Sequence, residues 1–382
     1  MNGHGNLPVF VELQDFCDIC CLLIDNKHVM TSQESQVTIN DVAKAAGVSK
    51  GTVDRVLHNR GEVSQKSKEK VLRVIEELGY KPNFYASILA SQKKHRIVCI
   101  IPEYAEGDFW SLTAKGVEDS RETAGRYGIT VDIVTYDQYE VDSFHDTCCR
   151  ILEEAPSGVA IAPMFRAETL VFVQELAARN IPYVYIDSKI EEDQDYFAYF
   201  GMPMYQSGYM CADLVMNGQE SDKVYVVRIE RDKNRQSDPT AARRAGFMKY
   251  MAEHYPDTEI VNVFIDPKNE KKRFDRLDET FAADNASKRI VMFNSRIHLV
   301  ADYVRSRSLS DIRIIGFDFL DRNVAALKDG TVQALIAQHS DRQVASAVLS
   351  LVDKFIMGAE VPKKDHYTQM DILNRYNCDY YM

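Results

Sequence analysis

The hydrophobic and polar positions follow two kinds of pattern, and the change falls near residue 96. Over 37–80, apolar residues recur at helical spacing, as Ile39, Val42 and Ala46 do. After residue 96, short runs of consecutive apolar residues alternate with amphipathic stretches. Such runs are typical of strands that are buried on both faces. The pattern therefore predicts a small helical unit followed by a larger unit in which strands and helices alternate.

Three short helices are predicted over 37–80. Gly47 supplies a turn after the first, and Ser49 is a natural N-cap for a second helix over 50–57. Ser64 caps a third helix, which Gly79 closes. The positions of the third helix expected to face inward are Val71, Leu72, Val74, Ile75 and Leu78. The first two helices are joined by residues 46–49 and have the spacing of a helix-turn-helix motif.

The larger unit is predicted to be α/β, with parallel sheets flanked by helices. Strand-like runs are expected over 97–101, 129–134, 158–162, 183–186, 224–229, 260–265, 290–293 and 312–316. Helical stretches between them include 111–127, 169–179, 205–217 and 240–254. About 285 residues is large for one sheet, so two lobes with a cleft between them are expected.

These patterns divide the chain into segments. The expected segments are an irregular extension over 1–36, the helical unit over 37–82, a short helix and linker over 83–95, a first lobe over about 96–201 and 339–360, and a second lobe over about 202–338 and 361–382. The extension carries Cys17, Cys20 and Cys21, which resemble a metal knuckle, but no second Cys pair or spaced His pair follows. We therefore predict no metal and no cofactor. A start at Met30 is an alternative to the extension.

Composition excludes several classes of protein. Of the 382 residues, 45% are hydrophobic and 27% are charged, which is ordinary for a globular chain and unlike disordered or collagen-like sequences. No apolar stretch approaches the roughly 20 residues that cross a bilayer, so no membrane partner is expected. The eight cysteines are too sparse for a disulfide scaffold, and no secretion signal is recognisable. The expected location is the reducing cytoplasm.

The net charge of −11 is unevenly distributed along the chain. Residues 37–96 contain 12 Lys and Arg against 6 Asp and Glu, a balance of +6, so the remainder carries −11 − 6 = −17. An acidic total argues against a polyanionic partner, but the basic segment offers a place where one could bind. The helical unit is therefore the candidate nucleic-acid-binding part.

The segment Val37-Thr38-Ile39-Asn40-Asp41-Val42-Ala43-Lys44-Ala45-Ala46-Gly47-Val48-Ser49, followed by Thr52-Val53-Asp54-Arg55-Val56-Leu57, closely resembles the headpiece of the lactose-repressor (LacI/GalR) family. Tyr80-Lys81-Pro82-Asn83, leading to Ala86 and Leu89, resembles the hinge helix of that family. The remainder is similar to its two-lobed sensor, which is like a periplasmic binding protein. The resemblance covers about 345 residues and is most specific in the headpiece.

The resemblance implies that the second helix enters the major groove of operator DNA and that Lys50, Gly51 and Arg55 read bases. Thr38, Ser49 and Thr52 suit phosphate contacts. Asp54 and His58 stand where the family commonly has Ser and Asn. In the hinge, the expected DNA-binding residues are Asn83, Ala86 and Leu89, with Leu89 as a minor-groove wedge. The alternative is a helical bundle with a solvated charged face that contacts protein.

Ligands of a two-lobed α/β fold bind where strands end. Each of seven candidate positions follows or ends a predicted strand or lies on an adjacent helix, and most match polar ligand anchors of sugar-binding members of the superfamily. They are Phe109, Trp110, Asp187, Arg243, Asn294, Asp318 and Gln338. Singly, such residues are more often helix caps, loop contacts or core packing. Together they favour a pocket for a small ligand, expected to be a sugar. Ser188 departs from pentose binders that carry Arg beside the Asp, so the particular sugar stays open.

The sequence thus predicts a transcriptional regulator whose operator affinity is controlled by a small ligand. It is expected to act as a homodimer on a pseudo-palindromic site, with a tetramer left open. The alternatives are an α/β enzyme and a free-standing solute-binding protein. No nucleotide-binding or hydrolase motif follows a suitable strand, and His339 near Asp341 is the sole hint of acid–base chemistry. We therefore predict that the protein is not an enzyme.

Overall fold

The structure is a computed structural model that describes residues 37–57, 63–80, 94–229, 240–281, 288–361 and 363–381. The chain divides into two compact units, Met1–Phe84 and Tyr85–Met382. The extension with its cysteines, His58 and the hinge residues Asn83, Ala86 and Leu89 lie outside the described residues, so the predictions made for them stay predictions.

The first unit contains the three predicted helices, α2 (Ile39–Ala46), α3 (Lys50–Leu57) and α4 (Gln65–Glu77). Thr38 caps α2 in a capping box with Asp41, and Gly47 ends it in the left-handed conformation with φ 57°. The Oγ atom of Ser49 accepts a hydrogen bond from the backbone N of Thr52 at 3.1 Å, which caps α3. The three helices form a small core, made of Val42, Ala43, Ala46, Val53, Val56, Val71 and Val74 together with Tyr80.

Two of the inward positions predicted for the third helix are wrong. Leu72 and Leu78 are 49% and 37% exposed, whereas Val71 and Val74 are buried. Residue 72 lies about 100° around the helix from residue 71, outside the narrow stripe that a core this small can cover. Leu78 is the C-cap of α4, beyond its last full turn.

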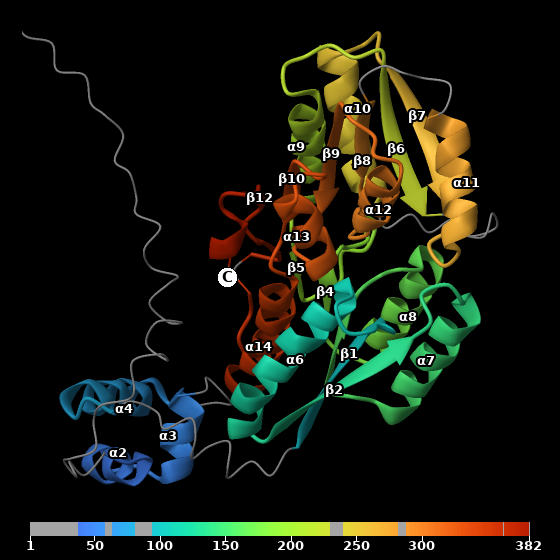
Figure 1. The fold of residues 1–382 in the computed structure, drawn as a ribbon. Helices are drawn as coiled ribbons and strands as arrows, with labels where there is room; N and C mark the ends of the chain where they lie inside the picture. Colours follow the sequence, from blue (N-terminus) through green and yellow to red (C-terminus); the bar gives the residue numbers. More distant parts are fainter. Residues whose placement is uncertain are drawn as a thin grey trace, which may run out of the picture. The chain divides into compact units, whose positions relative to one another are not determined.

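The first lobe of the second unit is a parallel sheet in the order β11-β5-β4-β3-β1-β2. Its strands are β1 (His95–Pro102), β2 (Ile129–Tyr136), β3 (Gly158–Ile161), β4 (Tyr183–Asp187), β5 (Ala198–Gly201) and β11 (Asp365–Tyr367). The helices of this lobe are α6 (Phe109–Arg126), α7 (Val141–Glu154), α8 (Arg166–Ala178) and α14 (Ser340–Met357). Figure 1 shows α6 and α14 side by side on this lobe.

The second lobe repeats this plan, with its sheet in the order β12-β10-β9-β8-β6-β7. Its strands are β6 (Lys223–Ile229), β7 (Glu259–Ile265), β8 (Lys288–Met292), β9 (Ile312–Phe317), β10 (Ala334–Ala337) and β12 (Asp371–Leu373). The helices are α9 (Met204–Met216), α10 (Ala241–His254), α11 (Glu270–Phe281), α12 (His298–Ser306) and α13 (Asp321–Lys328). Only β12 is antiparallel to its neighbour among the described strand pairs. The short 3₁₀ helix Cys378–Tyr380 follows.

Both faces of the second sheet are covered, as the uninterrupted apolar runs predict. Along β6, Tyr225 and Val227 pack into the core that includes side chains of α11, α12 and α13. Val224 and Val226 point the other way and pack with side chains of α9 and α10. The α/β class with two parallel-sheet lobes flanked by helices is thereby confirmed.

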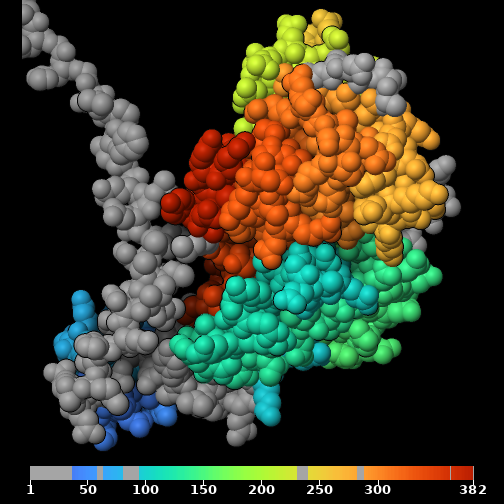
Figure 2. Space-filling model, in the orientation of Figure 1, coloured from blue at the N-terminus to red at the C-terminus, as the bar shows by residue number. Residues whose placement is uncertain are grey.

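The chain passes between the lobes three times in the described residues, and one boundary differs from the expectation. The passages lie between β5 and α9, between β10 and α14, and between β11 and β12. The second lobe was expected to resume at residue 361, yet β11 pairs with β5 of the first lobe. This three-residue edge strand has no apolar pattern, and its Asp365 is held by an ion pair of 2.6 Å to Lys189. Figure 2 shows the two lobes meeting along a seam, with the green-to-teal first lobe below.

Two glycines bring α9 and α10 into backbone contact. A Cβ on Gly246 would lie 1.9 Å from the Tyr205 carbonyl oxygen, and one on Gly208 would lie 1.7 Å from that of Arg243. These distances leave no room for any side chain. The close approach therefore sets the position of α10, the helix that carries Arg243.

Gly246→Ala is expected to lower the free energy of unfolding by about 1–3 kcal/mol or more, because the added methyl group forces the two helices apart. Gly125→Ala is the matched control, since a Cβ there meets no atom within 4 Å. That change should leave stability unchanged or raise it by up to about 1 kcal/mol. Urea unfolding followed by circular dichroism measures both, and equal effects of the two variants would contradict the close-packing argument.

Candidate functional site

One pocket collects side chains from both lobes. It is lined by all seven residues predicted as ligand contacts, namely Phe109, Trp110, Asp187, Arg243, Asn294, Asp318 and Gln338. The first three belong to the first lobe and the next three to the second. Gln338 follows β10, where the chain returns to the first lobe. The expectation that strand ends converge thus agrees with the geometry, and ligand binding by these residues stays a proposal.

The aromatic pair lies at the start of α6. The rings of Phe109 and Trp110 contact edge to face, with centroids 4.9 Å apart. Trp110 is only 7% exposed and belongs to the core of the first lobe, whereas Phe109 is partly buried and packs against that core. The two rings therefore pack in the core of the first lobe and also line the pocket. Phe109 is the more exposed of the two.

Arg243 is a buried cation on α10. Its Nη1 donates to the Phe293 carbonyl oxygen at 2.7 Å, and its guanidinium carbon lies 4.3 Å from the centroid of the Phe317 ring. Its Nε is sealed from solvent without a hydrogen-bond partner among the described residues. A buried guanidinium N–H without an acceptor is unfavourable in the free protein. The site therefore holds an unsatisfied donor beside the pocket.

Two carboxylates face this cation from different lobes. The buried Asp318 accepts a hydrogen bond from Nε2 of Gln338 at 2.8 Å. Burial raises the pKa of Asp187 to about 6, Arg243 opposes this effect, and the Asp318 charge adds to it. Burial also raises the pKa of Asp318, with Arg243 and Gln338 acting in the other direction. Asp187, Arg243, Asp318 and Gln338 thus form one electrostatic group, which we call the carboxylate–arginine cluster.

The backbone at three strand ends is held in an uncommon conformation. Asp187, Asp318 and His339 have φ values of 63°, 70° and 53°, a left-handed region that few non-glycine residues adopt. The Tyr199 hydroxyl donates to the Asp187 carbonyl oxygen at 3.0 Å and so fixes this turn. Such conformations persist where surrounding contacts impose them, and they concentrate at functional sites.

Sequence reasoning did not assign several further pocket residues. They are Asp108, Gln138, Tyr139, Met164, Met204, Ile229, Thr240, Ser295, Arg296, His298 and Leu320. Asp108, Ser295 and Arg296 lie within two residues of predicted residues, so proximity along the chain could have indicated them. The others lie on loops, at helix starts or, for Ile229, at the end of β6, and their approach to the pocket depends on how the two lobes fold. The alternative role for Asn294, a local loop contact, is also present, because its Oδ1 accepts a hydrogen bond from the Arg296 backbone N at 3.0 Å.

His339 stands at the N-cap position of α14, and its side chain bonds outside that helix. It precedes α14 without a side-chain capping bond, and its Nε2 lies 3.0 Å from a carboxylate oxygen of Asp371. Its ring stacks on Tyr381 at 4.4 Å. The contact with Asp371 joins the second and third passages between the lobes, and His339 is not a lining residue of the pocket. Among the described residues, no group of three or more His, Cys, Asp or Glu side chains could hold a metal ion.

The second candidate site is the outer face of α3. The side chains of Lys50, Asp54 and Arg55 are exposed there, and so is Gly51. Val53 and Val56 on the opposite face are buried in the headpiece core. Three predicted phosphate contacts already have partners within the headpiece. The Thr38 hydroxyl donates to Asp41 at 2.6 Å, and those of Ser49 and Thr52 bond each other at 2.9 Å.

No helix in the described part of the chain has both the length and the apolar character needed to cross a membrane.

The fold and the pocket define a two-lobed binding protein preceded by a helix-turn-helix unit. Residues 97–359 match the periplasmic binding protein domain, and residues 38–83 match the family of bacterial regulatory proteins named after lacI. The chain is 33% identical to a protein of known crystal structure from Bacteroides fragilis that is described as a putative LacI transcriptional regulator, with a TM-score of 0.72 over 76% of this chain and 100% of that one. The chain belongs to the LacI family of bacterial regulatory proteins.

Curated relatives match shorter segments. The chain is 34% identical over 156 residues to the ribose operon repressor of Halalkalibacterium halodurans, which is 41% of this chain and 44% of that protein. It is 29% identical over 152 residues to the HTH-type transcriptional regulator DegA of Bacillus subtilis, or 40% and 44% of the two chains. The chain therefore spans less than half the length of these relatives. A glucose-galactose binding protein from Geobacillus stearothermophilus, 18% identical with a TM-score of 0.64 over 75% of this chain and 99% of that one, shares the fold.

Asp187→Asn is expected to stabilise the ligand-free protein near neutral pH. Because the pKa of Asp187 is raised on folding, its ionisation removes stability as the pH rises from about 4 through about 6. The variant loses this penalty, so its advantage over the wild type should grow over that interval by an amount on the order of 2 kcal/mol. Unfolding measured between pH 4.5 and 7.5 tests this.

Asp266→Asn serves as the control with the opposite sign. Hydrogen bonds from the backbone N of Lys268 and of Asn269 lower the pKa of Asp266. Its ionised form therefore stabilises the fold, so the stability of the variant relative to the wild type should fall as the pH rises to about 4 and then stay level between pH 4.5 and 7.5. If the free energies of unfolding of Asp187→Asn and of the wild type changed with pH in parallel, this would contradict the conclusion that burial raises the pKa of Asp187.

Proposed function

We propose that the protein is a transcriptional regulator that binds operator DNA through α3 and senses a small polyhydroxylated ligand, a sugar or sugar derivative, in the interlobe pocket. One observation carries this proposal. The pocket of this chain brings together polar residues from the strand ends of both lobes, in a chain that also has a LacI-family helix-turn-helix unit.

The DNA-binding part of the proposal rests on exposed donors on one face of a well-capped helix. Lys50 and Arg55 project from the face of α3 that the headpiece core does not use. Both side chains can donate to guanine acceptors in the major groove. Gly51 leaves the backbone accessible between them, and no atom lies within 3.5 Å of a Cβ placed there. Contacts by Asp54, His58 and the hinge residues Asn83, Ala86 and Leu89 are proposed on the family resemblance alone.

The sugar-sensing part rests on the carboxylate–arginine cluster. Carboxylates accept from hydroxyl groups, and a guanidinium donates to hydroxyl or ring oxygens. The aromatic ring of Phe109 supplies an apolar face beside them. The ribose operon repressor named above is named for a sugar operon. A ligand that bonds Asp187 of one lobe and Arg243 of the other would stabilise the closed arrangement of the lobes.

In this proposal the protein acts in the cytoplasm, where its operator lies, and it works as a homodimer without catalysis. The named relatives are regulators and repressors. Two-fold symmetric operators require paired headpieces, which is the physical reason to propose a dimer. A thermal-shift screen of sugars, nucleosides and their phosphates tests the ligand class, because a ligand that binds the native state raises its melting temperature.

Arg55→Ala is expected to weaken operator binding by about 1–3 kcal/mol and to relax the preference at one base pair, because a bidentate base contact is lost. Arg73→Ala removes the same charge from an exposed position of α4 and is the matched control. It should change the salt dependence without changing base preference. Binding is measured by fluorescence anisotropy on a selected operator and on single-base variants. If both variants show the same base preference as the wild type, the assignment of α3 as the reading helix fails.

Arg243→Ala is expected to abolish the response to a ligand found in the screen while DNA binding without that ligand persists. Because Arg243 also holds the Phe293 carbonyl oxygen, a melting curve must show that the variant is folded. If Arg243→Ala does not fold, Asn294→Ala provides the test instead, because the hydrogen bond described for the Asn294 side chain is a local one to the backbone of Arg296. This change should weaken ligand binding several-fold. If both variants bound the ligand with wild-type affinity, the ligand would not bind in the interlobe pocket.

A further inference from the structure

His298 is a pocket residue that none of the sequence patterns indicated. It begins α12, is only 9% exposed, and lines the same pocket as the carboxylate–arginine cluster. Its partner is Asn323 on α13, whose side chain is fully buried. The hydrogen bonds of Asn323 determine which nitrogen of the imidazole carries the proton, and this in turn determines what His298 offers to a ligand.

The orientation of the Asn323 amide follows from its surroundings. Its Nδ2 lies 2.9 Å from the carbonyl oxygen of Ser295, 3.1 Å from that of Phe317 and 3.2 Å from that of Asp318. Carbonyl oxygens only accept hydrogen bonds, so the atom among them has to be the NH₂ group. The other end of the amide is therefore Oδ1, an acceptor.

This acceptor fixes the tautomer of His298. Oδ1 of Asn323 accepts from the His298 backbone N at 3.2 Å and lies 3.0 Å from Nδ1 of the imidazole. Oδ1 has no proton to donate, so Nδ1 must carry one. Burial lowers the pKa of His298, which keeps the ring neutral near pH 7. A neutral imidazole with a proton on Nδ1 presents a lone pair on Nε2.

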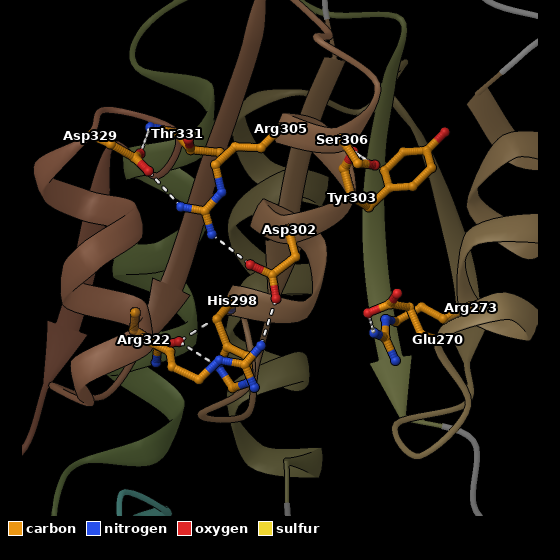
Figure 3. A network of polar contacts seen from close by, with 11 residues as sticks. Glu270, Arg273, His298, Asp302, Tyr303, Arg305, Ser306, Arg322, Asp329 and Thr331 are labelled. Carbon is orange, nitrogen blue, oxygen red and sulfur yellow. Dashed lines mark hydrogen bonds and ion pairs between the residues drawn. The ribbon is translucent and has the colours of Figure 1, made fainter.

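A second contact between α12 and α13 lies on the same face of α12 as His298. Asp302, one turn along α12, receives ion pairs of 2.6 Å from Arg322 of α13 and from Arg305. Figure 3 shows His298, the Asp302–Arg322 ion pair between the two helices and the Asp302–Arg305 pair within α12. Among the described residues, no donor bonds Nε2, and His298 is at the pocket wall. Nε2 is therefore a fixed acceptor that the protein itself leaves unused.

We propose that Nε2 of His298 accepts a hydrogen bond from a hydroxyl group of the bound sugar, which makes His298 a specificity-determining residue of the pocket. This inference rests on the proposed function of the pocket. A fixed acceptor rejects analogues that lack the matching donor, because its lone pair would be buried without a partner. The pocket should therefore discriminate against the deoxy sugar that lacks this one hydroxyl.

Two substitutions separate contact with the sugar from a purely structural role. His298→Asn retains a donor at the place of Nδ1, facing Asn323, but has no atom at the place of Nε2. His298→Gln supplies an amide near the place of Nε2 but loses the donor to Asn323. We expect His298→Asn to melt near the wild-type temperature and to bind the sugar roughly tenfold more weakly, and His298→Gln to recover part of the affinity. Normal affinity in His298→Asn, with a loss confined to His298→Gln, would overturn the proposal.

The probe is D-ribose, followed by D-arabinose, D-tagatose and D-allose, titrated by calorimetry into the full chain. With the sugar that binds, one monodeoxy analogue should lose about tenfold affinity for the wild type and no more than about twofold for His298→Asn. If every monodeoxy analogue lost the same affinity for the wild type as for His298→Asn, this would count against a hydrogen bond between the sugar and Nε2 of His298.

Nitrogen-15 spectra of the histidine rings test the acceptor without any ligand. The signals that vanish in His298→Asn should show a protonated Nδ1 and an unprotonated Nε2, and a protonated Nε2 would overturn the inference. If no sugar binds the wild type, the proposed function of the pocket fails and the contact with sugar fails with it. If sugars bind and the spectra show the other tautomer, the function stands and only the role of His298 is rejected.

Discussion

The strands whose ends line the pocket run parallel to their neighbours in each sheet. This common strand direction brings the functional side chains together. The carboxyl ends of β4, β8, β9 and β10 all lie at the interlobe side, so the residues that follow them meet there. Asp187, Asn294, Asp318 and Gln338 come from four separate parts of the chain and share no sequence context. Their proximity is a consequence of strand direction and of the passages of the chain between the lobes.

The pocket is assembled at some expense of stability. The unpartnered Nε of Arg243, the raised pKa of Asp187 and the left-handed turns at Asp187 and Asp318 are all unfavourable in the ligand-free protein. The rest of the fold compensates through the buried cores of the two sheets and the close contact of α9 with α10. A ligand that satisfies these groups gains affinity from them, and since they lie on both lobes its binding couples the lobes.

Sequence patterns predicted well where a local physical rule applies. The bounds of α3, the caps at Ser49 and Ser64 and the direction of the strands follow from helix periodicity, capping chemistry and apolar runs. They predicted poorly where packing decides. Leu72 looks like a core position by composition but lies outside the stripe that the headpiece core covers. β11 has no apolar signature because its pairing depends on backbone hydrogen bonds and on the Lys189–Asp365 ion pair.

The sequence by itself determined the class of fold, the LacI-family headpiece and the seven predicted pocket residues, because each follows from spacing along a strand or helix or from a motif. Tertiary structure alone decided how those residues interact. The shifted pKa of Asp187 depends on burial and on the charges of Arg243 and Asp318, neither of which is near it in the chain. The tautomer of His298 depends on an asparagine 25 residues away, whose orientation is fixed by three carbonyl oxygens. Long-range electrostatics and hydrogen-bond direction are properties of the folded arrangement, and local sequence carries no signal for them.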